Sequence, residues 1–358
     1  MAELFGTNLS RAEILARVGD ISQICDARRM TLSEGRASGV EIVEVYTGSG
    51  LRFTVVPSRG MDISHASFQG IPLAWRSSVG ETSPFLFQPE GYEWLRSFFG
   101  GLLTTCGMTY ASHPCEDEGE SLGLHGRVSN IPAEDVSVTK RWIEDDFHIN
   151  ISGTVREVGV LKSNLSLTRR ISTSMSSRII RIADTVTNHG FVPSPLMMLY
   201  HINSGWPLLS ETTRLVAPVR SSTYFDPRAE KEADQWSRFD APVADYAERC
   251  YLHDMEPNTN GNIDVLVLNE EREIGMMITY PKREFPSFIE WKMMGTGEYV
   301  LGTEPGNITG NRADMRSAGN LEMIDPGAQR TFHLDISVIA GKNEIKTCLS
   351  ALSNTNEE

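Results

Sequence analysis

The stretch Phe147-His148-Ile149-Asn150-Ile151 alternates apolar and polar side chains at every position. A period of two places one set of side chains against a core and the other toward water, which is typical of a half-buried β-strand. Five further segments also have the composition and patterning of strands: 40–45, 51–55, 164–168, 178–186 and 332–338. The chain is therefore rich in β-strands along most of its length.

Three other segments are apolar without interruption, at 195–200, 265–268 and 276–280. Short runs of this kind predict strands that are buried on both faces. No long pattern of helical periodicity lies between the strands, which argues against alternating β-α-β units. The predicted fold is all-β, a large antiparallel β-sandwich with a few short helices.

Three places are expected to be helical. Asn8 or Ser10 can cap a helix near the N-terminus, which Gly19 would end. The segments 92–99 and 229–238 are the other two candidates. All three are short compared with the strands around them.

The chain shows no linker, no internal repeat and no shift in composition that would mark a domain boundary. We therefore expect a single domain over residues 1–358, although length alone would allow two or three. Within it, residues 1–35 are predicted to form an N-terminal helical extension. The polar residues 352–358 are predicted to be a flexible tail.

The formal net charge of −14 argues against binding to nucleic acids or anionic membranes. No apolar stretch approaches the roughly 18 residues of a membrane span, and no secretory signal is recognisable. The five scattered cysteines fit free thiols in a reducing compartment. We expect a cytoplasmic protein whose partner is a small molecule. Its oligomeric state is open, with a homodimer as one option.

Three segments place ionisable groups beside glycine or proline at expected strand ends. They are Leu122-Gly123-Leu124-His125-Gly126-Arg127, the run from Leu196 to Gly205 that contains His201, and Tyr299–Asn307, which contains Glu304. Glycine lets the backbone approach a ligand closely. A single histidine or glutamate in such a setting is more often structural, so each of these signals is weak alone.

Together the three segments resemble the aldose 1-epimerase (galactose mutarotase) superfamily. Leu124-His125-Gly126 matches the family's Leu-His-Gly motif, and Tyr200-His201-Ile202-Asn203 resembles its second histidine segment in outline. Glu304 takes the late position of the family's catalytic glutamate, and the order agrees from about residue 39 to 340. The resemblance implies a galactose mutarotase-like supersandwich and a sugar as substrate.

Polar residues near these motifs are the candidates for holding the sugar. The Gly-Arg-x-x-Asn-Arg phrase, which supplies the family's substrate-binding arginine, has no counterpart around residues 104–113. Another arginine would have to replace it, and Phe225-Asp226 resembles a segment whose aspartate holds sugar hydroxyls. The candidate substrate-binding residues are Arg59, Asp62, Arg76, Arg127, Asn203, Asp226, Lys292 and Asn307.

Interconverting anomers requires a base at the anomeric hydroxyl and an acid at the ring oxygen. By resemblance, Glu304 is the base, His201 is the acid and His125 positions the ring oxygen. Histidine suits the acid because its ordinary pKa lies near neutrality, and burial could raise the pKa of Glu304. Neither a metal nor an organic cofactor is expected. Three tryptophans could offer a flat face to the sugar: Trp75, Trp206 and Trp291.

Three alternatives remain open at this stage. A non-catalytic sugar-binding protein could use the same fold. An isomerase, lyase or hydrolase of an acidic sugar could use the surplus arginines to hold a carboxylate or phosphate. A metal site would draw on Cys106, His113, Cys115 and His125, but their spacing lacks a paired C-x₂-C motif.

Overall fold

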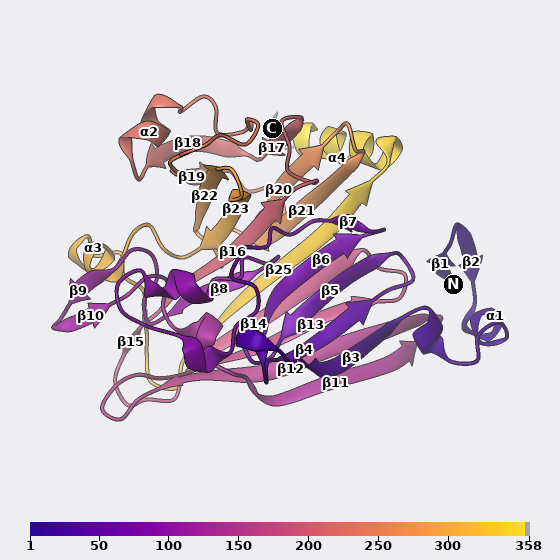
Figure 1. The fold of residues 1–358 in the computed structure, drawn as a ribbon, viewed down its shortest axis with the longest axis horizontal. Helices are drawn as coiled ribbons and strands as arrows, with labels where there is room; N and C mark the ends of the chain where they lie inside the picture. The colour runs from indigo at the N-terminus through magenta and orange to yellow at the C-terminus, as the bar shows by residue number, and fades with distance from the viewer. Residues whose placement is uncertain (355–358) are drawn as a thin grey trace.

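The computed structural model describes residues 1–354, and antiparallel β-sheets dominate it (Figure 1). In spatial order, the strands of the largest sheet are β11 (Glu134–Ile143), β12 (Asp146–Val158), β13 (Asn164–Ser174), β14 (Ile179–Asn188), β25 (Gln329–Ala340), β21 (Ile274–Pro281), β20 (Asn262–Asn269) and β17 (Thr213–Val216). The alternating stretch 147–151 lies in β12, which pairs with β11 and β13. This confirms the all-β fold.

Two further large sheets pack against this one. One consists of β18 (Val219–Tyr224), β19 (Arg249–Met255), β22 (Ser287–Met294), β23 (Tyr299–Gly306), β16 (Met197–Gly205) and β8 (Thr104–Met108). The other consists of β3 (Asp26–Thr31), β4 (Glu41–Tyr46), β5 (Leu51–Val56), β6 (Asp62–Phe68) and β7 (Ile71–Pro72). A single buried apolar cluster draws residues from all three sheets, for example Phe53, Ile151 and Tyr200.

Short elements decorate the sheets. Three two-stranded hairpins or bridges are β1 (Ala2–Leu4) with β2 (Thr7–Leu9), β9 (Cys115–Asp117) with β10 (Glu120–Leu122), and β15 (Ser194–Pro195) with β24 (Met323–Ile324). The α-helices are α1 (Arg11–Leu15), α2 (Pro227–Lys231), α3 (Arg312–Ser317) and α4 (Lys342–Asn354). The 3₁₀ helices are η1 (Ile21–Gln23), η2 (Gly35–Ala37), η3 (Pro84–Leu86), η4 (Glu93–Ser97) and η5 (Val128–Asn130).

The N-terminal region differs from the predicted helical extension at 1–35. Its α-helix is only α1, which Ser10 caps through a capping box with Glu13. The region also contributes β1 and β2, and β3 joins the five-stranded sheet by pairing with β4. The physical reason is that β4 presents an open edge, and β3 satisfies its backbone groups.

The C-terminal end also differs from the prediction. Residues 352–354 belong to α4 rather than to a flexible tail, and 355–358 lie outside the described residues. The helix packs Ile345 against Leu266, Leu268 and Met277 of the large sheet. Burial of this apolar face accounts for a helix whose sequence is otherwise polar.

The two internal helical predictions hold in part. The segment 92–99 contains η4 rather than an α-helix, and the segment 229–238 contains only the end of α2. Asp226 caps α2 and Pro227 occupies its first turn, so the helix begins and ends earlier than predicted.

Candidate active site

A cavity of about 410 Å³ opens on one face of the six-stranded sheet. Its floor comes from β16, β19, β22 and β23, and its walls come from η4 and from the loops at 75–79, 112–113 and 124–125. It contains all three residues predicted to be catalytic, His125, His201 and Glu304. Segments far apart in the sequence therefore converge on one site.

His201 and Glu304 lie side by side on the cavity floor. The register of β16 with β23 sets Ile202 opposite Thr303, which places the neighbouring His201 and Glu304 on the same face of the sheet. The Nε2 atom of His201 lies 3.2 Å from Oε1 of Glu304, and both side chains are almost completely buried. The sequence predicts only that His201 and Glu304 share a pocket. The register of the two strands brings them into direct contact.

Both strands are covered on both sides, which explains their continuous apolar runs. Met198, Tyr200 and Ile202 of β16 point into the main core. The alternate positions, Leu199 and His201, point into the cavity. A histidine at the end of such a strand is therefore surrounded by protein on every side except the cavity.

Gly302 makes room for this pair. A Cβ atom at this position would lie 2.4 Å from Oε1 of Glu304 and 3.3 Å from Cε1 of His201. Glycine thus allows the carboxylate to fold back beside the imidazole. The sequence shows Gly302 but gives no sign that its absent side chain shapes the site.

His125 reaches the cavity from the loop that follows β10. Its φ of 57° is uncommon for a residue other than glycine. Its backbone N–H donates to Ser112 O at 3.0 Å, and its carbonyl accepts from Gly107 N at 2.9 Å. These bonds hold the left-handed conformation that aims the imidazole inward.

Aromatic rings enclose the two imidazoles. Trp94 lies 4.9 Å from His125 between ring centroids, and Phe98 and Trp291 lie 5.2 and 5.3 Å from His201. The His125 and His201 rings are 5.8 Å apart. In both histidines Nδ1 is buried and has no hydrogen-bond partner. Buried polar atoms without partners are unusual, and these two belong to residues that line the cavity.

Burial shifts the proton affinities of these groups in opposite directions. It lowers the pKa of His201 to about 3 and lowers the pKa of His125 well below its usual value. It raises the pKa of Glu304 well above its usual value, and nearby Glu248 adds to this effect. The expectation of a histidine pKa near neutrality differs from these lowered values, because desolvation disfavours the charged imidazolium. The raised pKa of Glu304 agrees with prediction.

The predicted substrate-binding residues Arg59 and Asp62 lie inside the protein, not at the cavity. Arg59 donates to Ser129 O at 2.6 Å, to Thr82 Oγ1 at 2.8 Å and to Ser97 O at 2.9 Å. Asp62 pairs with Arg169 at 3.1 Å. Neither residue lines the cavity, and Oδ2 of Asp62 is buried without a hydrogen-bond partner.

Arg76 and Arg127 are also directed elsewhere. Arg76 makes two hydrogen bonds of 2.5 Å with Glu81. Arg127 is exposed and lies beside Tyr110. Neither side chain lines the cavity, so no predicted arginine replaces the one missing from the family phrase.

Asn203 and Asp226 lie near the cavity in the chain but do not line it. Asn203 is two residues from His201 on the same face of β16. Its side-chain amide donates to the backbone carbonyl of His201 at 3.0 Å, and its backbone carbonyl accepts from Trp75 N at 2.9 Å. Asp226 caps α2 by accepting from Arg228 N and Ala229 N. Neither residue lines the cavity, and Oδ1 of Asn203 is buried without a hydrogen-bond partner.

The predicted substrate-binding residues Lys292 and Asn307 also lie outside the cavity lining. Lys292 is buried on the core side of β22, where its Nζ donates to Gln235 O at 3.1 Å. Asn307 accepts from Met198 N at 2.7 Å and donates to Leu196 O at 3.0 Å. Asn307 also donates to the Glu322 carboxylate at 2.8 Å, and neither Lys292 nor Asn307 lines the cavity.

Several residues that line the cavity were not predicted from the sequence. Of the three tryptophans predicted to face a sugar, Trp75 and Trp291 line the cavity, whereas Trp206 is exposed elsewhere. The residues that the sequence analysis did not assign to the pocket include Tyr92, Trp94, Phe98, His113, Glu248 and Glu298. The spacing of Trp94 and Phe98 in one helical turn was the only available signal.

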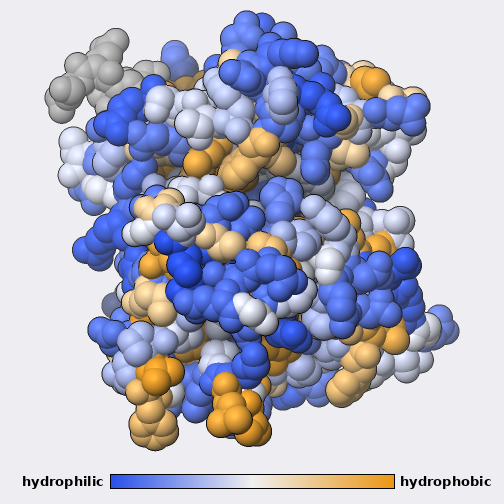
Figure 2. Space-filling model, turned by 90° about the vertical axis from the view of Figure 1, so that its left-hand side faces the viewer, coloured by the Kyte–Doolittle hydropathy of each residue, from blue (hydrophilic) through white to orange (hydrophobic). Residues whose placement is uncertain are grey.

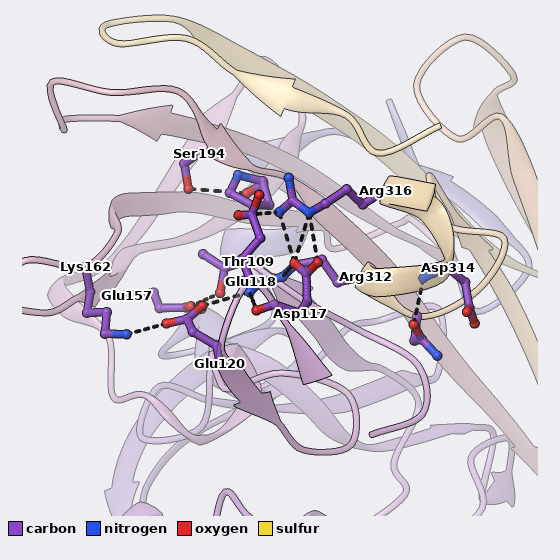
Figure 3. A network of polar contacts seen from close by, with 12 residues as sticks. Thr109, Asp117, Glu118, Glu120, Glu157, Lys162, Ser194, Arg312, Asp314 and Arg316 are labelled. Carbon is purple, nitrogen blue, oxygen red and sulfur yellow. Dashed lines mark hydrogen bonds and ion pairs between the residues drawn. The ribbon is translucent and has the colours of Figure 1, made fainter. Parts of the chain in front are cut away.

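An ion-pair cluster braces the loop that leads to His125 (Figure 3). Asp117 of β9 bonds to Nε of Arg312 at 2.6 Å and to Nε of Arg316 at 2.8 Å. Arg312 also bonds to Glu120 of β10 at 2.7 Å. The cluster fixes the β9–β10 hairpin, which precedes His125, to α3, which follows Glu304 along the chain.

Within residues 1–354, no group of three or more His, Cys, Asp or Glu side chains could hold a metal ion. The four residues of the alternative metal site do not form such a group. No helix in that range is both long enough and apolar enough to cross a bilayer.

Comparison with known protein families matches residues 37–338 to a domain of unknown function, DUF4432. The chain belongs to the DUF4432 family. No curated protein matches it.

Solved structures show which fold this DUF4432 chain shares. A candidate aldose 1-epimerase from Klebsiella pneumoniae superposes with a TM-score of 0.88 at 25% identity, covering 93% of this chain and 88% of that one. A galactose mutarotase-like protein from Clostridium acetobutylicum gives 0.63 at 11% identity, covering 89% and 100%. Galactose 1-epimerase from Lactobacillus acidophilus gives 0.58 at 11% identity, again covering 89% and 100%. The chain therefore has the galactose mutarotase-like fold.

Proposed function

We propose that this DUF4432 protein interconverts the anomers of an aldose or modified sugar by acid–base ring opening. The observation that carries the proposal is the buried contact between His201 and Glu304, 3.2 Å apart on the cavity floor, with the His125 ring beside them. The names of the structural neighbours support the same class of reaction. Binding alone would not need a proton donor and acceptor in contact.

The proposed reaction needs one proton on the His201–Glu304 pair. The Glu304 carboxylate takes the proton of the anomeric hydroxyl while His201 donates its proton to the ring oxygen, so the C1–ring oxygen bond breaks and an open-chain aldehyde forms. Rotation about the C1–C2 bond and reversal of both transfers close the ring on the other face. His125 positions the ring oxygen, and the cycle returns the pair to its starting state.

The shifted pKa values suit this exchange. Burial raises the pKa of Glu304, which makes its ionised form a stronger base. Burial lowers the pKa of His201 to about 3, which makes its protonated form a stronger acid. The proposed ring opening starts from the form that has the proton on His201 and the negative charge on Glu304. A sugar that hydrogen-bonds to both groups would favour that charge-separated form.

The test is anomer exchange measured by NMR on a panel of aldoses at neutral pH. We expect at least one sugar to exchange its α- and β-anomer signals faster than in buffer alone. Saturation-transfer measurements on the same samples report binding independently. Binding without accelerated exchange for every sugar would contradict the proposal and favour a sugar-binding protein.

A further inference from the structure

Apolar side chains form a large part of the cavity wall, beside hydrogen-bonding groups such as Ser77, Ser112 and His113. Trp75, Trp94, Phe98 and Trp291 form a contiguous set of rings, with neighbouring centroids 4.7 to 6.4 Å apart. The aliphatic side chains on the wall are Val79, Leu95, Leu124, Leu199, Ile289, Met293 and Ile308. This apolar surface suits a ligand that has apolar groups as well as hydroxyl groups.

The apolar lining continues to the mouth, where it meets water. Tyr92 is 57% exposed, Leu95 49% and Phe225 37%, although all three line the cavity. The face of the molecule in Figure 2 is mostly hydrophilic, with separate hydrophobic groups. Exposed apolar side chains at the mouth of a pocket favour a ligand that covers them.

The charges at the mouth have one sign. Glu248 and Glu298 line it and are exposed, and no lysine or arginine of the described residues lines the cavity. Glu248 also accepts a hydrogen bond of 2.7 Å from Nε1 of Trp291. A carboxylate or phosphate on the sugar would be repelled here, which argues against the acidic-sugar alternative.

The volume of the cavity also favours a ligand larger than a monosaccharide. The cavity of about 410 Å³ falls within the range of roughly 300 to 1,000 Å³ that is usual for drug-sized ligands. A monosaccharide is smaller than such a ligand. The space beyond the sugar ring would therefore lie beside Tyr92, Leu95 and Phe225 at the mouth.

We infer that the substrate is an uncharged reducing sugar that carries an apolar substituent away from its anomeric carbon. The sugar ring occupies the inner end beside His201 and Glu304, and the substituent lies against the apolar mouth. The anomeric hydroxyl stays free, as ring opening requires. This inference rests on the proposed function and names the substrate class of the same site.

The experiment compares D-glucose and D-galactose with their 4-O-benzyl and 6-O-benzyl ethers and with the corresponding uronates. We expect kcat/KM for anomer exchange to be at least tenfold higher for one or more ethers than for the parent sugar, because the benzyl group leaves water on binding. Exchange of the uronates should be slower than that of the parents. Equal or lower values for every ether, or a preference for a uronate, would overturn the inference.

Variants locate the effect at the mouth. Leu95→Ser should reduce the ratio of kcat/KM between ether and parent several-fold. Phe85→Ser is the matched control, because Phe85 is 92% exposed close by in the chain but does not line the cavity, and the ratio should stay unchanged. Equal ratios in Leu95→Ser and the wild type would count against the assignment.

The two proposals can fail separately. If the parent sugars exchange as fast as the ethers, the proposed apolar substituent is contradicted, whereas the proposed isomerase activity is supported. If saturation transfer shows tighter binding of the ethers but no sugar exchanges, the proposed isomerase activity is contradicted. The apolar mouth is then supported as a binding site.

Discussion

Two groups of opposite proton affinity meet on the cavity floor at His201 and Glu304. Water could reach them only through the cavity, and aromatic rings cover the remaining sides. Desolvation favours the neutral form of each group, which raises the pKa of Glu304 and lowers the pKa of His201. A ligand that replaces water with directed hydrogen bonds changes that balance, which is how the same burial can serve catalysis.

Gly302 provides a test of the geometry of this pair. Gly302→Ala should lower the rate of anomer exchange by roughly a hundredfold, because the new Cβ would displace the Glu304 carboxylate. The protein should still fold, because the closest contact is the end of a side chain. Exchange NMR and thermal unfolding measure the two effects. Gly19→Ala, where no atom lies within 4 Å, is the control. An unchanged exchange rate in Gly302→Ala would show that the carboxylate position does not matter.

The sequence indicated three residues that line the cavity, but most of its candidates for holding a sugar lie elsewhere. Glycine and proline beside His125 and Glu304 leave a visible pattern, because the backbone itself must approach the ligand. The positions of Arg59 and Lys292 show no such pattern in the sequence. Whether their donors face a cavity or a backbone carbonyl depends on segments far away in the sequence, such as Ser97 and Gln235.

At the scale of elements, the pairing of β16 with β23 brings His201 beside Glu304, and short elements position His125. The β9–β10 hairpin carries the chain into His125, and α3 follows β23 after Glu304. Asp117 connects the two through Arg312 and Arg316, with the Asp117 and Arg312 side chains almost fully buried. Buried ion pairs of this kind contribute to the specificity of a structure more than to its net stability.

Asp117→Ala should lower the free energy of unfolding by about 3 kcal/mol, because it leaves the buried Arg312 charge with only part of its compensation. Chemical denaturation measures this loss. Glu118→Ala is the matched control, since its carboxylate is 67% exposed and pairs with Arg316 at 3.2 Å. The control should lose less than about 1 kcal/mol. Similar losses in both variants would mean that the hairpin is not held through Asp117.

Strands were easier to predict than helices, for a physical reason. Alternation in β12, β13 and β25 comes from a sheet with one buried face, and it is visible in any window of five residues. The helix α4 buries only a narrow face against β20 and β21, so its sequence looks like a polar tail. The strand β3 has a mostly exposed pattern and depends on pairing with β4.

At the scale of the whole molecule, several carboxyl groups are buried without full compensation. Burial raises the pKa of Asp62 and of Glu157 to about 7 and raises the pKa values of Glu290 and Glu304. A raised folded-state pKa gives a stabilising contribution below the ordinary pKa of the group. That contribution is lost as the pH rises through the folded-state value. The protein should therefore be less stable at pH 8 than at pH 6.

Glu157→Gln should remove part of this pH dependence. The amide stays neutral, and its oxygen can still accept from Thr109. Relative to the wild type, the variant should gain on the order of 2 kcal/mol between pH 5 and pH 8, as measured by denaturation at each pH. The exposed Glu134→Gln on β11 is the control and should show no such gain. A parallel pH profile for the wild type and Glu157→Gln would contradict the assignment.

The pairing of distant strands lies beyond what the sequence could provide. The strand β14 pairs with β25, and β16 lies between β23 and β8, although long segments separate them in the chain. Alternation identifies which residues form strands but not which strands become neighbours. Only the resemblance to a known superfamily supplied the arrangement, and the structure confirms it.

The most direct test of the account is the rate of anomer exchange in Glu304→Gln, measured by NMR beside the wild type on a sugar that the wild type turns over. The amide preserves the size of the side chain but cannot take a proton. The account predicts that exchange falls by about 10²-fold or more while saturation transfer still reports sugar binding. Exchange at the wild-type rate in the folded variant would contradict the assignment of Glu304 as the base.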